Sequence, residues 1–293
     1  MKSICAQTHE STRQQSLHLT KQLHGKQTLH VQSLFMRLGS NQHAKTILND
    51  MSFNLRVGHV MAVLGPNGAG KSSLLHSLSG DIKLQNGQIF FDEQSISDLS
   101  PKTLATMRAV LPQQQSMSFN MRVSTVVAMG AYPFIQANPN DVTQWVAQAL
   151  QEVDLEALQN RDYLALSGGE QQRVQFARLL VQAYAIIQQR GHVYIFLDEP
   201  TASLDPKHQV LLMRVVRALA DSRCAAVLVV MHDLNLAARW CDKVLLLNHG
   251  QVVTCDHPKQ ALTSDRLESV YGIPMTVMRN PHHDQSVWVI SHG

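Results

Sequence analysis

The sequence contains few charged and few aromatic residues. Lys, Arg, Asp and Glu make up 16% of its 293 residues and Phe, Trp and Tyr 5%, whereas 44% are hydrophobic. This balance argues against a disordered or coiled-coil chain and is typical of a globular protein. The length fits one large domain or two small ones. Because the net charge is only +3, the composition does not indicate a nucleic-acid partner, and we expect none.

The chain also lacks paired cysteines and long apolar segments. None of its four cysteines forms a C-x-x-C pair, so we expect reduced thiols in a cytosolic protein rather than disulfides or a zinc site. The longest apolar stretch, 224–231, is far shorter than the roughly 20 residues of a spanning helix. The N-terminus carries no apolar segment typical of a signal peptide. We therefore expect a soluble or peripherally bound protein.

Hydrophobic patterning indicates one folded domain after a short extension. Residues 1–27 are rich in Gln, His, Ser and Thr and show no periodicity, which predicts a flexible extension. From residue 28 to residue 293 we expect a single domain. Residues 52–56 alternate polar and apolar side chains like a half-buried strand, and residues 244–253 have the pattern of a hairpin.

Buried strands alternate with helical patterns along this domain. Apolar runs at 60–64, 193–197 and 226–231 are typical of fully buried strands, and helices separate them. This order predicts an α/β fold whose core sheet is mostly parallel. Residues from about 96 to 166 lack β-branched runs and have helical spacing, so we predict an inserted helical subdomain there.

A glycine-rich segment after the first buried run predicts a phosphate-binding loop. Residues 65–72 match the pattern GxxxxGK[ST] between a strand and a helix start. A chance match in such a chain is on the order of one in a hundred at average glycine usage. Backbone N–H groups and the helix N-terminus would bind phosphates, Lys71 would reach the β- and γ-phosphates, and the Ser72 hydroxyl would bind Mg²⁺. The predicted phosphate-binding residues are Gly65, Pro66, Asn67, Gly68, Ala69, Gly70, Lys71, Ser72 and Ser73.

Two carboxylates follow the second buried run. Asp198 and Glu199 lie where α/β sheets bind ligands, at the C-terminal end of a strand. Asp198 would hold Mg²⁺, and Glu199 would act on the attacking water as a general base. Such a pair alone more often caps a helix, but the phosphate loop upstream favours the catalytic interpretation.

The segment Leu166–Arg173, LSGGEQQR, predicts a helix whose first turn is exposed. Ser167 and Glu170 form a capping box. Gly168 and Gly169 leave the first N–H groups uncovered, and such a helix start binds anions. A plain capped helix is the alternative, although the two glycines expose more backbone than a cap requires.

Together, the phosphate loop, LSGGEQQR and the FLDEP run at 196–200 resemble the nucleotide-binding subunits of ATP-binding-cassette (ABC) transporters. The resemblance covers about residues 28–260 and implies the P-loop NTPase fold of ABC ATPases, with an N-terminal antiparallel β-subdomain. It implies ATP and Mg²⁺ as cofactors. Gln113 is similar to the Q-loop glutamine, Asp205 to the D-loop aspartate and His232 to the switch histidine. The implied catalytic residues are Glu199, His232 and Gln113, with Ser72, Gln113 and Asp198 at the metal.

The resemblance also implies an assembly. Two subunits would form a head-to-tail homodimer in which Ser167, Gly168, Gly169 and Asp205 of one subunit cover ATP bound by the other. The dimer would act with two transmembrane permease subunits, contacted through about 116–133, and indirectly with a periplasmic substrate-binding protein. This places the chain peripherally on the cytoplasmic face of a bacterial inner membrane.

One family feature is missing from the sequence. The family usually stacks an aromatic side chain on adenine just after the first strand, where Leu38 stands here. Phe35 or His43 could replace that aromatic contact. The adenine contact therefore stays open, whereas phosphate binding does not depend on it.

Three segments narrow the resemblance to one group of importers. Residues 108–113, 127–130 and 232–239 resemble the importers of haem, ferric siderophores and cobalamin. The long segment 181–192 resembles the haemin-import ATP-binding subunits, which makes haem the first choice of cargo. A siderophore or cobalamin importer is the alternative. A non-transport ABC ATPase usually has two cassettes or a coiled coil, which the sequence lacks, and an exporter with separate subunits stays open.

Overall fold

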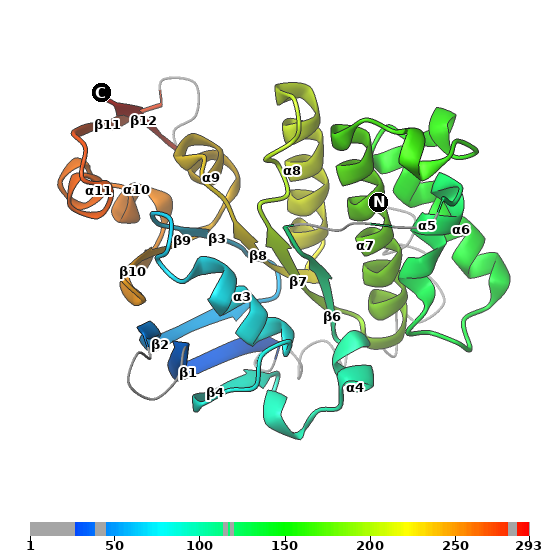
Figure 1. The fold of residues 1–293 in the computed structure, drawn as a ribbon, viewed down its shortest axis with the longest axis horizontal. Coiled ribbons are helices and arrows are strands. Elements are labelled where there is room, and N and C mark those ends of the chain that lie inside the picture. Colours follow the sequence, from blue (N-terminus) through cyan, green and yellow to red (C-terminus); the bar gives the residue numbers. More distant parts are fainter. Residues whose placement is uncertain (1–26, 39–44, 114–116, 118–119, 281–285, 293) are drawn as a thin grey trace, which may run out of the picture.

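The computed structural model describes residues 27–38, 45–113, 117, 120–280 and 286–292. Apart from Gln27, the predicted flexible extension lies outside the described residues. Figure 1 shows the described chain as a central sheet with helices against it, a second sheet that contains the N-terminal strands, and a C-terminal hairpin.

The central sheet is mostly parallel, as the sequence predicts. Its strand order is β10-β9-β3-β8-β7-β6, and only β10 runs antiparallel to its neighbour. The apolar runs predicted as buried strands correspond to β3, β7 and β8, in which every residue is buried. The strands are β3 (Val60–Leu64), β6 (Arg108–Leu111), β7 (Val193–Asp198), β8 (Ala225–Val230), β9 (Lys243–Asn248) and β10 (Gln251–Asp256).

Alternating residues of these strands divide the apolar core between the two faces of the sheet. In β3, Val60, Ala62 and Leu64 pack on one face, whereas Met61 and Val63 pack on the other. Burial on both faces requires apolar side chains at every position, which explains the continuous apolar runs.

The first face is covered by helices. They are α5 (Val123–Ala128), α6 (Pro139–Glu152), α7 (Gly168–Arg190), α8 (Pro206–Asp221) and α9 (Leu234–Trp240). In Figure 1, α5, α6 and α7 lie together at the right of the sheet. Near the C-terminus follow α10 (Pro258–Ala261), α11 (Ser264–Tyr271) and the hairpin of β11 (Met275–Arg279) and β12 (Val287–Ser291).

The second face packs against α3 (Lys71–Ser79), α4 (Pro101–Ala105) and an antiparallel sheet. That sheet has the order β2-β1-β4-β5 and confirms the predicted N-terminal antiparallel subdomain. Its strands are β1 (Thr28–Leu38), β2 (Lys45–Arg56), β4 (Asn86–Phe91) and β5 (Gln94–Ser95).

The predicted helical range 96–166 needs a correction. It contains β6, which pairs in parallel with β7 and forms the last strand of the central sheet. The sequence signal fails here because β6 has four residues and alternates buried with half-buried positions, so it shows no apolar run. Helices lie on both sides of β6 in this range: α4 precedes the strand, and α5 and α6 follow it.

Within the part of the chain that the structure describes, no helix is both long and apolar enough to cross a bilayer.

Candidate active site

The predicted site residues meet where four neighbouring strands end. Strands β3, β8, β7 and β6 are parallel neighbours, so their C-terminal ends lie along one edge of the sheet. At this edge α/β sheets bind their ligands. The residues that follow these strands are the loop 65–70 after β3, His232 after β8, Asp198 and Glu199 at the end of β7, and Gln113 after β6.

The loop between β3 and α3 depends on glycine where it passes neighbouring backbone. Gly65 has φ 146°, and a Cβ there would lie 2.3 Å from the Leu247 carbonyl oxygen. Gly70 precedes α3 with φ 101°, and a Cβ there would lie 2.8 Å from the Ile47 carbonyl oxygen. Only glycine fits both the positive φ and this close approach. The N-terminus of α3 is therefore directed to the loop without side chains in the way, as a phosphate site requires.

Lys71 is held inside this loop. Its Nζ donates to the carbonyl oxygens of Gly65 at 2.7 Å and of Pro66 at 3.0 Å. Burial lowers the pKa of Lys71, and the carboxylates of Glu199 and Asp198 oppose that effect. The loop thus positions a buried cation beside two acidic side chains.

Asp198 has the properties of a metal ligand. It is buried at the end of β7, and its Oδ1 atom has no hydrogen-bond partner among the residues that the structure describes. The pKa of Asp198 is raised, and burial is the largest cause. A hydrogen bond from Ser72 opposes the rise, and the Glu199 carboxylate adds to it. A buried carboxylate with a free oxygen beside a hydroxyl group is a donor set that fits Mg²⁺.

Glu199 joins the two other predicted catalytic residues. Its Oε2 accepts a hydrogen bond from Gln113 Nε2 at 2.9 Å, and its Oε1 lies 2.6 Å from His232 Nε2. A carboxylate oxygen can only accept, so His232 Nε2 is the donor. Glu199 has φ 49°, a rare value for a residue other than glycine that points to a functional constraint. The structure therefore brings Gln113, Glu199 and His232 together.

The LSGGEQQR segment folds as the capping box predicts. Ser167 is the N-cap of α7, and its backbone N–H and hydroxyl both donate to Glu170 Oε2 at 2.8 Å. These bonds lower the pKa of Glu170. A Cβ on Gly168 would meet open space, so the first turn of α7 is uncovered on that side.

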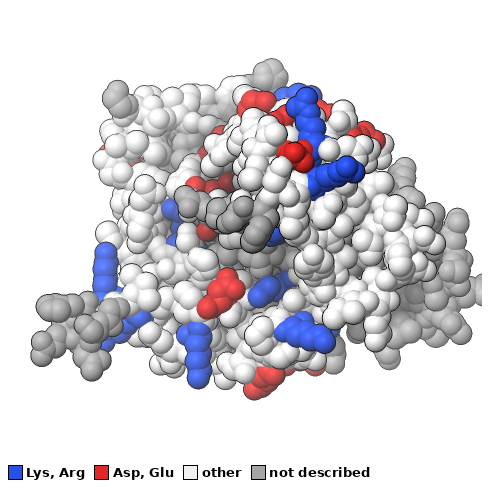
Figure 2. Space-filling view, turned by 45° about the vertical axis from the view of Figure 1, so that its right-hand side comes forward, with Lys and Arg blue, Asp and Glu red and all other residues white. Residues whose placement is uncertain are grey.

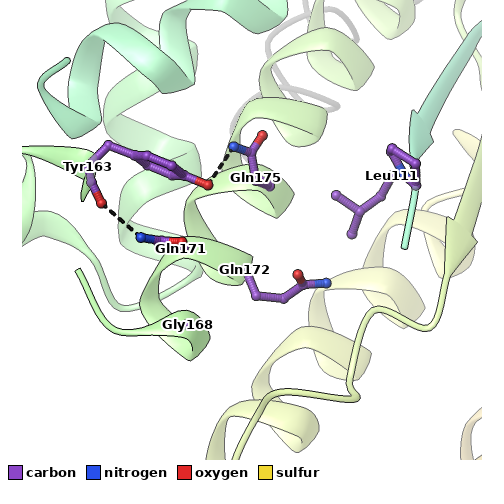
Figure 3. Close-up of a pocket in the computed structure, with 7 residues that line it drawn as sticks. Leu111, Tyr163, Gly168, Gln171, Gln172 and Gln175 are labelled. Carbon is purple, nitrogen blue, oxygen red and sulfur yellow. Dashed lines mark hydrogen bonds between the residues drawn. The ribbon is translucent and has the colours of Figure 1, made fainter. Parts of the chain in front are cut away.

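A small polar cavity lies beside this first turn (Figure 3). Its volume is about 70 Å³, and it separates α7 from Leu111 and Pro112 at the end of β6. Gln175 Nε2 donates to the Tyr163 hydroxyl at 2.9 Å, while Gln175 Oε1 is buried and has no partner in the described part of the chain. Polar space therefore lies between the first turns of α7 and the end of β6, although Leu111 itself is buried in the apolar core that β6 shares with α7.

The other predicted nucleotide contacts lie at the starts of two helices, α7 and α8. Asp205 caps α8: its Oδ1 accepts from the His208 backbone N–H at 3.0 Å, and its Oδ2 lies 2.8 Å from His208 Nδ1. A Cβ on Gly169 would lie 3.0 Å from the Ser203 carbonyl oxygen, so the starts of α7 and α8 approach each other. Among the described residues, no hydrogen bond joins Ser167, Gly169 or Asp205 to Lys71 or Asp198.

Two of the three positions considered for the adenine contact, Leu38 and Phe35, lie within the described residues. Leu38 is 49% exposed at the end of β1, and Phe35 is half-buried. His43 lies outside the described residues.

One neighbour of the phosphate loop has no signal in the sequence. Tyr271, at the end of α11, is half-buried against the loop, and burial raises its pKa to about 12 although a backbone hydrogen bond from Gly65 opposes the rise. Because about two hundred residues separate the two positions, sequence patterning alone cannot predict this contact.

The fold and the site define a P-loop ATPase: a phosphate loop with its lysine, a buried aspartate at the end of β7, and a glutamate oriented by a glutamine and a histidine. A family model described as ABC transporter matches residues 48–202.

Comparison with known proteins agrees with this class. The chain is 46% identical over 235 residues to the hemin import ATP-binding protein of Bordetella pertussis, a match that covers 80% of this chain and 90% of that protein. It is 46% identical over 237 residues to the protein of the same name from Pseudomonas fluorescens, covering 81% and 91%. A solved structure of a metal-chelate type ABC transporter in an inward-facing conformation matches with a TM-score of 0.72 and 26% identity, over 91% of this chain and 97% of that one. The chain belongs to the ABC transporter family and is an ATP-hydrolysing subunit of it.

Proposed function

We propose that this chain hydrolyses ATP to power the import of haem through a separate permease. The assignment of haem as the cargo rests on the 46% identity to hemin import ATP-binding proteins, over about nine-tenths of their length. The observation that carries the chemistry is the cluster of Gln113, Glu199 and His232 beside the phosphate loop.

In this proposal each residue of the site has a separate task. Lys71 neutralises charge on the β- and γ-phosphates, and the N–H groups of residues 65–70 bind phosphate oxygens. Glu199 accepts the proton of the attacking water, while Gln113 and His232 hold its carboxylate in place.

The proposed metal site uses Ser72, Asp198 and Gln113. The unpaired Oδ1 of Asp198 and its link to the Ser72 hydroxyl support this assignment. When bound, Mg²⁺ would neutralise phosphate charge that develops during hydrolysis.

The proposal includes a homodimer with shared sites. Ser167, Gly168, Gly169 and Asp205 have no hydrogen bond to Lys71 or Asp198 within the described chain, and the uncovered first turn of α7 can bind phosphate from another subunit. Each site would then be complete only when two copies meet head to tail.

The proposed permease contact lies in the helical part of the fold. In and beside the predicted range 116–133, Tyr132 is 72% exposed and Ile135 is 85% exposed. Large apolar side chains this exposed are typical of an interaction surface. On the face shown in Figure 2, basic and acidic side chains lie scattered among uncharged ones. We propose that two permease subunits bind here, that a periplasmic binding protein acts indirectly through them, and that the chain lies peripherally on the cytoplasmic face of a bacterial inner membrane.

The segment that favours haem over related cargoes is part of α7. This helix continues to Arg190, and Ala183, Ala185 and Ile186 within the long segment are buried. Gln188 Nε2 donates to Asp141 Oδ2 of α6 at 3.0 Å. The additional residues therefore extend a packed helix.

A ferric-siderophore or cobalamin importer is the second candidate. The structural match to a metal-chelate type transporter favours it, because a ferric siderophore is itself a metal chelate.

A growth assay separates the two candidates. A strain that lacks this chain should fail to grow on haem as sole iron source and should grow on free iron salts. Reintroducing the wild-type chain should restore growth on haem, whereas a Glu199→Gln chain should not. Normal growth on haem with loss of siderophore or cobalamin uptake would replace haem by the second candidate.

A further inference from the structure

The C-terminal hairpin has one face packed on the domain and one face open. Met275, Val287 and Val289 are buried, whereas Met278 and Ile290 on the other face are 43% and 44% exposed. The hairpin lies beside α9, as Figure 1 shows. This helix begins two residues after His232.

Asn235 joins the first turn of α9 to β12 through two hydrogen bonds. Its Nδ2 donates to the Val289 carbonyl oxygen at 3.1 Å, and its Oδ1 accepts from the Val289 N–H at 2.8 Å. Val289 pairs with Val277 in the hairpin, but the Val277 N–H donates to Ser264 Oγ instead. The Asn235 amide therefore binds the outer edge of β12 as the peptide group of a third strand would.

Packing around this contact is open. A cavity of about 370 Å³ lies between α9 and the hairpin, with Asp233, Arg239 and Trp288 among the residues that line it. Because apolar packing is incomplete here, the paired hydrogen bonds of Asn235 fix the distance and angle between the two elements.

The same turn of α9 continues directly into the catalytic cluster. Asp233 caps the helix, with its Oδ1 accepting from the Leu236 N–H at 2.8 Å. His232 immediately precedes this cap and donates to Glu199. A displacement of the first turn of α9 therefore moves the backbone that carries the imidazole.

We propose that Asn235 is a positioning residue for hydrolysis, because it fixes α9 on the C-terminal hairpin and thereby holds His232 at Glu199. The proposal rests on the function proposed above for His232. It assigns the C-terminal hairpin a role in turnover, although its two strands form a sheet separate from the central one.

Steady-state ATPase kinetics of the full chain test the proposal. Asn235→Ala removes both bonds and should lower kcat about fivefold while the KM for ATP changes less than twofold, since Lys71 and the phosphate loop are untouched. Asn235→Asp keeps the shape and the acceptor but loses the donor, and should lower kcat about two- to threefold. Thr276→Val is the matched control: it removes a 2.7 Å hydrogen bond to His292 inside the hairpin and should leave kcat unchanged.

A double-mutant cycle distinguishes positioning from general loosening of the fold. If Asn235 acts through His232, adding Asn235→Ala to His232→Ala should cause no further loss of turnover. A further fivefold loss would overturn the proposal, as would unchanged kcat in both Asn235 variants while His232→Ala is impaired. Normal turnover in His232→Ala would instead overturn the catalytic assignment of His232 itself.

Discussion

At the scale of single residues, the site contains a buried carboxylate whose charge reduces the stability of the fold. Asp198 is buried beside a second carboxylate, and its pKa is raised above the ordinary value. When the pKa of a carboxyl group is higher in the folded state than in the unfolded state, the free energy of unfolding falls as the pH rises from the unfolded-state pKa through the folded-state pKa. Ionisation of Asp198 therefore lowers the free energy of unfolding of the chain without ligands.

Asp198→Asn should separate stability from function. Without ATP and Mg²⁺, we expect its urea midpoint at pH 7 to equal or exceed that of the wild type, because the buried charge is gone and the Ser72 hydroxyl keeps an acceptor. ATP hydrolysis should be lost together with the proposed metal ligand. Asp98→Asn, at an exposed position, should change neither the urea midpoint nor the rate of ATP hydrolysis. A clearly lower midpoint for Asp198→Asn would show that the charge stabilises the fold.

At the scale of elements, α7 is fixed at its N-terminal half by a buried arginine. Arg173 Nη1 donates to the carbonyl oxygens of Val153 at 2.8 Å and Asp154 at 2.7 Å, which follow α6. Arg173 is 8% exposed and its bond to Val153 is buried, so the Val153 carbonyl depends on this arginine rather than on solvent, whereas the bond to Asp154 is partly buried. The helix that carries Ser167 is thereby held to the helical part of the fold.

Arg173→Met should destabilise the chain by about 2 kcal/mol, because it leaves two carbonyl oxygens without a donor. Urea denaturation monitored by circular dichroism measures this change. Arg214→Met replaces an exposed arginine on α8 and should stay within about 0.5 kcal/mol of the wild type. Equal stabilities of the two variants would contradict the role of Arg173.

Elements with a local signal could be predicted from the sequence, and those that depend on distant partners could not. The capping box locates the start of α7 at Ser167, and continuous apolar runs locate β3, β7 and β8. Strand β6 was placed wrongly in a helical insertion, since its four residues form a strand only by pairing with β7.

The site shows the same division. The motifs predict that Gln113, Glu199 and His232 belong to one centre, and in the structure the parallel order of β6, β7 and β8 brings the three side chains within hydrogen-bond distance. The contacts of Tyr271 with the phosphate loop and of Asn235 with β12 join segments far apart in the sequence. No periodicity or motif marks such contacts, because they arise from tertiary packing.

At the scale of the whole molecule, the proposed shared site predicts how damaged subunits behave in mixtures. Lys71→Ala should weaken nucleotide binding, whereas Ser167→Arg should keep binding and lose turnover, because Ser167 would act on ATP held by the partner. Each variant alone should be inactive. A heterodimer of the two has one intact and one doubly damaged site.

Mixing these variants should therefore restore part of the ATPase activity, always below that of the wild type. Rates measured over a range of mixing ratios check this, with ATP-dependent dimer formation followed by analytical ultracentrifugation. Full activity of Ser167→Arg as a monomer would contradict a shared site.

The central claim is that Glu199, oriented by Gln113 and His232, activates water for ATP hydrolysis. The most direct measurement is the ATPase rate of Glu199→Gln beside its affinity for a fluorescent ATP analogue. The substitution keeps the size of the side chain and removes the charge that accepts the proton, so turnover should fall at least about a hundredfold while affinity stays within twofold. Near-normal turnover with normal affinity would contradict the claim.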